Sequence, residues 1–336
     1  MSSIHDNMNA KSSNQNALLE VRNLRVQFKL KAGILPAINN ISFSLQESET
    51  LGIVGETGSG KSVMAFSILR LIPSPPGEIV GGEILFEGED LLKKSDREMQ
   101  RIRGGKIAMI FQEPMTSLNP SFTVGQQISE CFRIHMGHSK RESLEGSQYV
   151  LNTVRVPSPR TMMGLYPYEL SGGIRQRVMI AMALACQPKV LIADEPTTAL
   201  DVTIQAQILE LLKELQEKYK MALILISHNL GVVASLCNRI GVMYAGSLVE
   251  LSGKTRLFTK PLHPYTIGLL RAIPRPEHRD QPLAAIPGSI CDLLDPPSGC
   301  KFHPRCYKVR EICKSDPPRL EKKAGDNQAA CFFPGE

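Results

Sequence analysis

The octapeptide Gly55-Glu56-Thr57-Gly58-Ser59-Gly60-Lys61-Ser62 has the pattern G-x-x-x-x-G-K-[ST]. It follows the apolar run Leu51–Val54, which is typical of a buried strand, and it precedes the helix-like segment Val63–Leu69. A strand, a glycine-rich turn and a helix N-terminus together form the setting that a phosphate-binding loop requires. The glycines let successive N–H groups turn inward around phosphate oxygens, and the helix presents its positive end to the same anion. The sequence therefore predicts a phosphate-binding loop at residues 55–62.

Two residues of this loop and two carboxylates further along the chain predict a site for a nucleotide and Mg²⁺. Lys61 is expected to reach the β- and γ-phosphates, and Ser62 to give its hydroxyl to the metal. The apolar run Val190–Ala193 ends in Asp194 and Glu195. Asp194 is expected to hold the Mg²⁺ shell at the strand end, and Glu195, which points the other way, to polarise the water that attacks the γ-phosphate. The alternative is a pair of solvated carboxylates.

Length, charge and hydropathy narrow the fold and function classes. The chain has 336 residues, 42% of them hydrophobic, which is enough for one large α/β domain with an appendage or for two domains. The net charge of +6 comes from scattered Lys and Arg, which predicts a solvated surface, with an anionic membrane face or nucleic acid as alternatives. The longest apolar run, Val178–Cys186, is about half the length that spans a bilayer. We therefore expect a soluble chain, with a disordered tail over residues 1–17 that lacks the apolar segment of a secretory signal.

Strands and helices alternate along most of the chain. Residues 18–30 and 37–45 have the alternation of half-buried strands, and residues 113–170 read as a helical insertion. After residue 170 the order strand–helix–strand resumes, which predicts a largely parallel sheet with ligands at the carboxyl ends of its strands. Proline is dense beyond about residue 260. That segment is expected to make few hydrogen-bonded ladders and to drape over another surface.

A second glycine motif identifies a family. The run Leu170-Ser171-Gly172-Gly173-Ile174-Arg175-Gln176 resembles the signature motif of the ATP-binding-cassette (ABC) superfamily. The other marks of that family follow in the expected order: Gln112 at a strand end, Pro196–Asp201 after the two carboxylates, and His228 after the strand that ends at Ser227. The resemblance covers about residues 18–275 and implies an α/β fold. This fold is a P-loop NTPase (RecA-like) core with an antiparallel β subdomain, a helical insertion subdomain and a proline- and cysteine-rich C-terminal extension.

The resemblance also implies site residues and an ATPase activity that uses ATP and Mg²⁺. Glu195 corresponds to the catalytic base, His228 to a residue that contacts the γ-phosphate, and Gln112 to a sensor of the metal and the attacking water. Ser171 and its two glycines would form a second anion cradle facing the ATP of a partner subunit, so that two subunits close head-to-tail. Phe28 would stack on adenine, or alternatively belong to the core. The residues expected to contact nucleotide are Phe28, Gly55, Glu56, Thr57, Gly58, Ser59, Gly60, Lys61, Ser62, Ser171, Gly172, Gly173 and Asp201.

Within the superfamily the chain resembles the oligopeptide and dipeptide importers. Phe111–Pro120 looks like their Q-loop, and His263–Thr266 with Leu269–Pro274 looks like their C-terminal extension. The resemblance implies an ABC domain over 18–259 and an extension over 260–336. It further implies a second, non-identical ATPase subunit, two membrane permease subunits, an extracytoplasmic solute-binding protein and a place on the cytoplasmic face of the inner membrane, with no nucleic acid partner.

Eight cysteines divide into two groups. Cys131, Cys186 and Cys237 lie in apolar, helix-like contexts and are expected to be small buried hydrophobes. Most of the others crowd into the last segment, where the spacing of four of them fits a [4Fe–4S] cluster. Zinc, whose close C-x-x-C pairs are absent, and unligated thiols remain alternatives. The expected cluster ligands are Cys300, Cys306, Cys313 and Cys331, with Cys291 as a spare.

Two other functions compete with an importer subunit. A soluble cassette ATPase that acts on nucleic acid or ribosomes would fit the positive charge, but such proteins commonly carry two cassettes or a long coiled-coil insertion, and the sequence has neither. A P-loop kinase does not explain the run at 170–176. The sequence departs from the family pattern at Thr57, Ile174, Asn229 and Tyr168-Glu169. None of these positions supplies a phosphate or metal ligand side chain.

Overall fold

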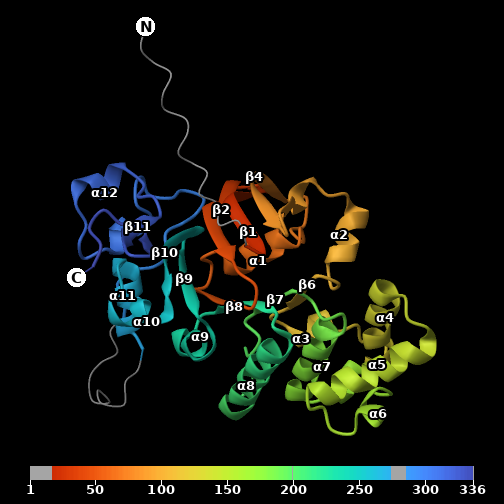
Figure 1. Ribbon diagram of the computed structural model, residues 1–336. Helices are drawn as coiled ribbons and strands as arrows, with labels where there is room; N and C mark the ends of the chain where they lie inside the picture. Colours follow the sequence, from red (N-terminus) through yellow and green to blue (C-terminus); the bar gives the residue numbers. More distant parts are fainter. Residues whose placement is uncertain (1–16, 199, 274–284, 336) are drawn as a thin grey trace.

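A computed structural model of the protein describes residues 17–198, 200–273 and 285–335. Within these ranges the strands form two sheets (Figure 1). The first has the strand order β2-β1-β4-β5, and the second has the order β11-β12-β10-β9-β3-β8-β7-β6. Residues 1–16, most of the predicted tail, lie outside the described residues. The fold is an α/β P-loop NTPase fold in which the predicted antiparallel and parallel sheets are both present.

The first sheet is the antiparallel unit at the start of the chain. Its strands are β1 (Leu19–Leu30), β2 (Gly33–Leu45), β4 (Gly77–Phe86) and β5 (Glu89–Asp90). Alternating apolar residues of β1 bury one face, as the period of two requires. That face packs on α1 (Lys61–Ile68) and on Ile53 of the second sheet. The short helices η1 (Leu91–Lys93) and α2 (Asp96–Ile102) follow, and Ser95 and Glu98 form a capping box at the start of α2.

The second sheet has a parallel centre that is buried on both faces. Its parallel strands are β3 (Thr50–Val54), β6 (Ile107–Ile110), β7 (Val190–Asp194), β8 (Ala222–Ser227) and β9 (Arg239–Tyr244). Alternate residues of β7 face two different cores: Leu191 packs with α7 (Gly172–Leu184), and Ile192 packs with α1. Helices α1 and α7 therefore lie on opposite faces of the sheet (Figure 1).

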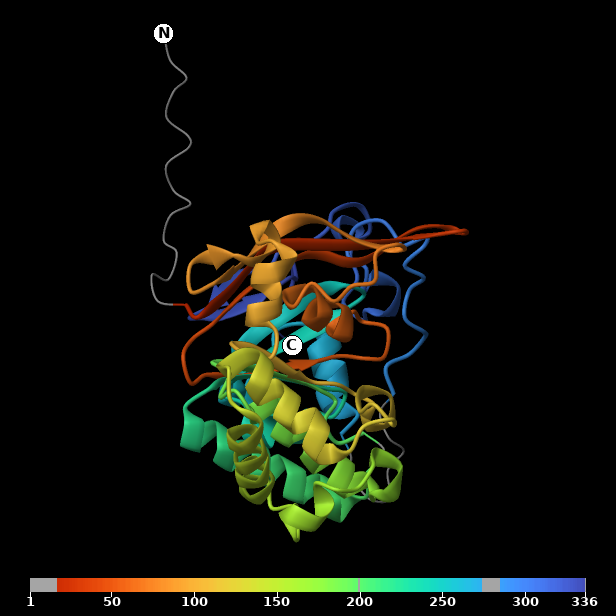
Figure 2. The same cartoon turned by 90° about the vertical axis from the view of Figure 1, so that its right-hand side faces the viewer.

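Helices occupy the segment between β6 and α7, where the sequence predicted an insertion. They are α3 (Pro114–Ser117), α4 (Val124–Met136), α5 (Lys140–Thr153), α6 (Pro159–Met162) and η2 (Pro167–Glu169). Capping boxes begin α4 at Thr123 and α5 at Ser139, and α4 ends at Gly137 with φ 69°. Figure 2 shows this lobe at the end of the molecule opposite the first sheet.

The last part of the chain departs from the expectation of few ladders. Helices α8 (Val202–Tyr219) and α9 (Leu230–Leu236) belong to the preceding core and come before β10 (Ser247–Gly253) in the chain. The elements that follow β10 are α10 (Lys254–Thr259), α11 (Pro264–Arg271), η4 (His303–Arg305), α12 (Glu311–Ser315), β11 (Glu321–Ala324) and β12 (Asn327–Ala329). Strand β12 pairs with β10 through Glu250↔Ala329 and Leu251↔Gln328. The extension thereby supplies the partner that the edge of β10 needs. In the described ranges, no helix is long and apolar enough to cross a membrane.

Candidate nucleotide-binding site

The loop at residues 55–62 follows β3 and leads directly into α1, as the motif predicts. Two of its glycines are required by close approach. A Cβ at Gly55 would lie 2.2 Å from the carbonyl oxygen of Met243, and a Cβ at Gly60 would lie 2.8 Å from that of Ala37. Gly60 also has φ 97°, in the left-handed region that disfavours side chains. The hairpin β9–β10 and strand β2 therefore hold the loop from behind.

Lys61 lies in the mouth of this loop. Its side chain is 6% exposed, and its Nζ donates to the carbonyl oxygens of Gly55, at 2.9 Å, and Glu56, at 3.0 Å. Burial lowers the pKa of Lys61, while the carboxylates of Glu195 and Asp194 oppose that shift. The ammonium group is thus held between the loop and the acidic strand end, where it can meet a phosphate.

Asp194 ends β7 and meets Ser62 of the loop. The Ser62 hydroxyl donates to the Asp194 carboxylate, whose pKa is raised mainly by burial. Among the described residues, Asp194 Oδ1 is buried without a hydrogen-bond partner, and so is Ser59 Oγ within the loop. A buried carboxylate oxygen without a partner beside a hydroxyl suits a hard cation with oxygen ligands. These residues therefore fit Mg²⁺ with a nucleotide phosphate.

Glu195 is the hub of a polar group at the carboxyl ends of three strands. Its Oε2 accepts from Gln112 Nε2 at 3.0 Å and from Thr198 Oγ1 at 3.0 Å, and it lies 3.3 Å from His228 Nδ1. The Glu195 side chain is 13% exposed, whereas that of His228 is 61% exposed. Glu195 has φ 46°, a conformation that is uncommon for a residue with a side chain and that often occurs at functional sites. The structure brings together three residues predicted for catalysis.

The second glycine motif lies at the N-terminus of α7. Ser171 is extended, with φ −67° and ψ 160°, and Ser171 and Gly172 are exposed. A Cβ at Gly173 would lie 3.1 Å from Ile204 Cγ2, so this motif is close to the start of α8, where Asp201 accepts from the N–H of Ile204 at 2.9 Å. The two glycine motifs thus begin helices that lie on opposite faces of the sheet, α7 and α1.

Phe28 has a packing role in the structure. It is half-buried on β1 and packs against the core of the first sheet. A Cβ at Gly77 would lie 3.0 Å from its ring atom Cε1. These contacts fit the alternative in which Phe28 belongs to the hydrophobic core. Stacking of Phe28 on adenine stays a prediction.

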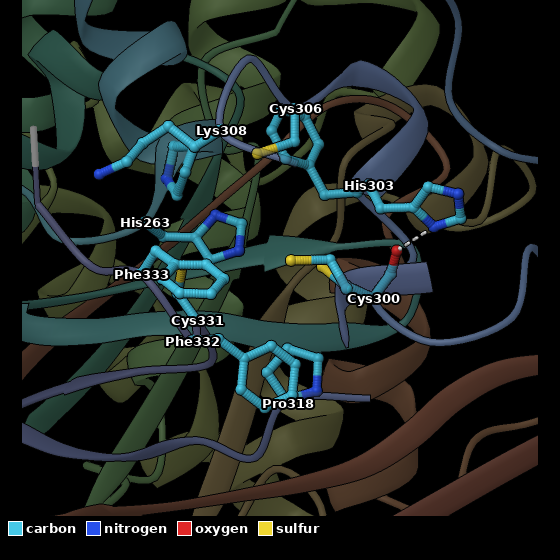
Figure 3. Close-up of a pocket in the computed structure, with 12 residues that line it drawn as sticks. His263, Cys300, His303, Cys306, Lys308, Pro318, Cys331, Phe332 and Phe333 are labelled. Carbon is cyan, nitrogen blue, oxygen red and sulfur yellow. Dashed lines mark hydrogen bonds between the residues drawn. The ribbon is translucent and has the colours of Figure 1, made fainter. Parts of the chain in front are cut away.

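The four cysteines of the expected cluster line one cavity in the C-terminal extension, together with His263 (Figure 3). Burial and, to a smaller extent, the neighbouring thiols raise the pKa of Cys300 to about 11. Within the part of the chain that the structure describes, no group of three His, Cys, Asp or Glu side chains is arranged to hold a metal ion. Of the three cysteines expected to be buried, Cys237 is buried, whereas Cys131 and Cys186 are only partly buried. Burial still raises the pKa of Cys131 to about 11.

The extension also reaches the phosphate-binding loop through two residues that sequence reasoning missed. Tyr265 Oη accepts from the backbone N–H of Glu56 at 3.0 Å. Arg305 Nη1 and Nη2 donate to Glu56 Oε2 at 2.9 Å and to Oε1 at 3.1 Å. Arg305 is 249 positions from Glu56 in the sequence. No local signal predicts a contact over that separation.

Three family profiles match the chain, one of them a profile described as AAA domain, putative AbiEii toxin, Type IV TA system, over residues 164–234. The profile described as ABC transporter matches residues 38–198, and the profile described as Oligopeptide/dipeptide transporter, C-terminal region, matches residues 249–313. The Oligopeptide transport ATP-binding protein OppD of Salmonella typhimurium is 49% identical over 321 residues, which are 96% of this chain and 95% of that protein. The Dipeptide transport ATP-binding protein DppD of Escherichia coli is 47% identical over 95% of this chain and 97% of its own length.

Solved structures agree with these matches. The dimeric ABC transporter cassette MJ0796 superposes with a TM-score of 0.63 and 28% identity, covering 70% of this chain and 98% of the cassette. The same cassette is known in a post-hydrolysis state bound to ADP and Pi. CbiO1 from Clostridium perfringens, part of the ABC transporter complex cbiONQ, has a TM-score of 0.60 at 25% identity, with 72% and 91% covered. The chain belongs to the ABC transporter ATPases of the oligopeptide/dipeptide transporter family and is an ATP-hydrolysing enzyme.

Proposed function

We propose that the chain couples ATP binding and hydrolysis to the uptake of dipeptides, oligopeptides or related solutes through partner permeases. The observation that carries this proposal is the match along nearly the whole chain to OppD and DppD, including the C-terminal region at 249–313. A soluble cassette that acts on nucleic acid is not favoured, because the similarity extends through the transporter-specific extension.

The proposed reaction uses the polar group at the ends of β6, β7 and β8. Lys61 and the loop amides bind the phosphates, and Ser62 and Asp194 hold Mg²⁺, which supplies charge neutralisation when bound. Glu195 accepts the proton of the attacking water. Gln112 and His228 both contact Glu195 Oε2, so they orient this carboxylate and the water beside it. The contact of both Gln112 and His228 with the same oxygen, Glu195 Oε2, supports this assignment.

We further propose a head-to-tail pair of ATPase subunits. The two anion cradles lie on opposite faces of the sheet, so Ser171–Gly173 is available to a nucleotide on a partner, with Asp201 at the seam between the subunits. The dimeric structure of MJ0796 supports such a pair. The proposed complex contains a second, non-identical ATPase, two permeases and, indirectly, a solute-binding protein. It places this chain on the cytoplasmic face of the inner membrane, with an ABC domain over 18–259 and an extension over 260–336.

The cysteine-lined cavity is proposed to hold a [4Fe–4S] cluster. Support comes from the four cysteines that line one cavity. A zinc ion would draw its ligands to about 2.3 Å from a single point, and the described side chains have no such group of three. A [4Fe–4S] cluster takes one thiolate on each of its four irons, so its cysteine sulfurs can lie further apart than the ligands of a single zinc ion. The cluster would pin a segment with little core of its own.

Two experiments test these proposals. Deletion of the gene should abolish uptake of a labelled dipeptide or tripeptide, and the wild-type gene, but not Lys61→Ala, should restore it. Uptake that continues in the deletion strain would assign the chain to another solute. Iron and sulfide analysis of anaerobically purified protein should give one cluster per chain, reduced in Cys306→Ser. Iron well below one cluster per chain would contradict the cluster, whatever the uptake assay shows.

A further inference from the structure

Arg305 lies in the cysteine-rich segment and pairs with the phosphate-binding loop. It belongs to η4 (His303–Arg305), between the cavity residues Cys300 and Cys306. Its two Nη atoms bind the two carboxylate oxygens of Glu56 at 2.9 and 3.1 Å. The Arg305 side chain is only 6% exposed and that of Glu56 is 27% exposed. A bidentate, largely buried pair of this kind fixes orientation as well as distance.

The guanidinium of Arg305 is itself held in place. Its Nε donates to the carbonyl oxygen of Pro287 at 3.0 Å. It also lies over the rings of Tyr244, at 5.8 Å, and Phe302, at 5.9 Å. Packing on two aromatic rings restricts the rotamers of Arg305. The Arg305 side chain therefore links the extension to Glu56 in a fixed orientation.

Two further contacts join the extension to the same loop. The N–H of Glu56 donates to Tyr265 Oη at 3.0 Å, and the ring of Tyr265 packs on Phe302 with centroids 5.4 Å apart. Lys301 Nζ donates to the carbonyl oxygen of Ala245 at 2.7 Å, and the next residue, Gly246, donates its N–H to Ser59 O at 3.0 Å. The extension therefore holds the loop directly at Glu56 and, through Ala245 and Gly246, at Ser59.

We infer that the cysteine-rich segment positions the phosphate-binding loop for nucleotide, with Arg305 as the positioning residue. A change at the cysteines that line the cavity therefore changes the affinity of the loop for nucleotide. The turn η4 transmits the coupling, because its backbone bonds link both ends. The N–H of His303 donates to Cys300 O at 2.8 Å, and the N–H of Cys306 donates to His303 O at 3.2 Å. Figure 3 shows Cys300, His303 and Cys306 together at the cavity. A shift of either cysteine moves the turn that carries Arg305.

The first test is a double-mutant cycle on nucleotide affinity in the full-length protein. Calorimetric titration with Mg²⁺–ADP reports binding to the loop without turnover. Arg305→Met and Glu56→Gln are each expected to raise Kd by roughly tenfold, a size typical of coupling between sites. The double variant should be no weaker than either single variant, because the pair acts as a unit. Arg305→Lys keeps the charge but loses the fork, so its Kd should lie between those of wild type and Arg305→Met.

Lys314→Met is the matched control, since Lys314 lies in the same segment and pairs with Glu311 instead of the loop. Its Kd should equal that of wild type. With ATP as substrate, Arg305→Met should raise KM more than it lowers kcat, a split that a loss of folded protein would not produce. Unchanged affinity in Arg305→Met and Glu56→Gln, or additive losses in the double variant, would overturn the inference.

A second cycle tests the link to the cavity. Cys306→Ser is expected to weaken Mg²⁺–ADP binding in the wild-type background and to have no further effect in the Arg305→Met background. An equal loss in both backgrounds, or no loss in either, would overturn the coupling between the cavity and the loop. Thermal melting of each variant separates lost folding from lost affinity. If Arg305→Met does not fold, the same comparison with Arg305→Lys decides the question.

Discussion

Gln112 Nε2 donates to Glu195 Oε2 at 3.0 Å, across 83 positions of sequence. The two residues follow β6 and β7, which are neighbours in the parallel sheet, so their strands deliver both side chains to the same edge. His228 follows β8, the next strand, and its Nδ1 lies 3.3 Å from the same oxygen. The amide and the imidazole therefore constrain one carboxylate oxygen, and Glu195 Oε1 is not part of this group of contacts.

Replacing Glu195 by Gln should lower the rate of ATP hydrolysis by about 10²- to 10⁴-fold, the range for losing a positioned general base. Nucleotide binding should persist, because the loop and Lys61 are unchanged. The measurement is phosphate release at saturating ATP, with calorimetric binding alongside. Glu217→Gln on the exposed face of α8 is the control and should behave like wild type. A rate near wild type in Glu195→Gln would show that another group takes the proton.

Replacing Asp194 by Asn should raise the Mg²⁺ concentration needed for half-maximal activity by about tenfold or more, because the amide offers the cation no charge. Burial already raises the pKa of Asp194, so the Mg²⁺ requirement of the wild type should also increase as the pH falls toward that pKa. The variant should lose this pH dependence. Titration of activity with Mg²⁺ at several pH values checks both points. An identical Mg²⁺ requirement in variant and wild type would remove Asp194 from the metal site.

The nucleotide-binding residues could be found from sequence because their signals are local. The loop at 55–62 has a fixed motif between a buried strand and a helix, and Asp194 and Glu195 directly follow a continuous apolar run. Strands that are parallel share a carboxyl edge, so residues after β6, β7 and β8 could be expected to meet. The order of the strands then fixes which of them are neighbours.

The remaining features depend on contacts between distant segments. Strand β11 (Glu321–Ala324) has a charged composition without apolar alternation, and it forms because β12 pairs with the edge of β10. The pair of Arg305 with Glu56 likewise joins two segments that only the fold brings together. Periodicity and motifs carry no information about such pairings. These long-range pairings nevertheless determine how the extension contacts the phosphate-binding loop.

Replacing Gly55 by Ala should abolish tight nucleotide binding, because the added Cβ would lie 2.2 Å from the Met243 carbonyl and would force the loop to move. Overpacking of this kind typically costs about 1–3 kcal/mol of stability as well. Gly253→Ala is the control, since Gly253 has φ −60° and a Cβ there meets nothing within 4 Å. Calorimetric Kd and melting temperature test both variants. If Gly55→Ala bound nucleotide as tightly as wild type, the loop would have room for a Cβ at this position that the structure does not show.

Replacing Glu87 by Gln should destabilise the protein by at most about 1 kcal/mol at neutral pH, since Glu87 is an exposed residue and exposed ion pairs contribute no more than this. Glu87 follows β4 and accepts from Lys189 and Lys106, next to β7 and β6, so it joins the two sheets. The bond to Lys189 is the first cause of its lowered pKa. The folded carboxylate therefore binds protons less readily than the unfolded one, and its contribution is present above about pH 4.5 and is lost as the pH falls through the folded pKa. The denaturation midpoint of Glu87→Gln should be lower than that of wild type at pH 7 and equal to it at acidic pH. The control Glu210→Gln, on the exposed surface of α8, should match wild type at both pH values. A lower midpoint of Glu87→Gln that persists in acid would assign the lost stability to packing instead of charge.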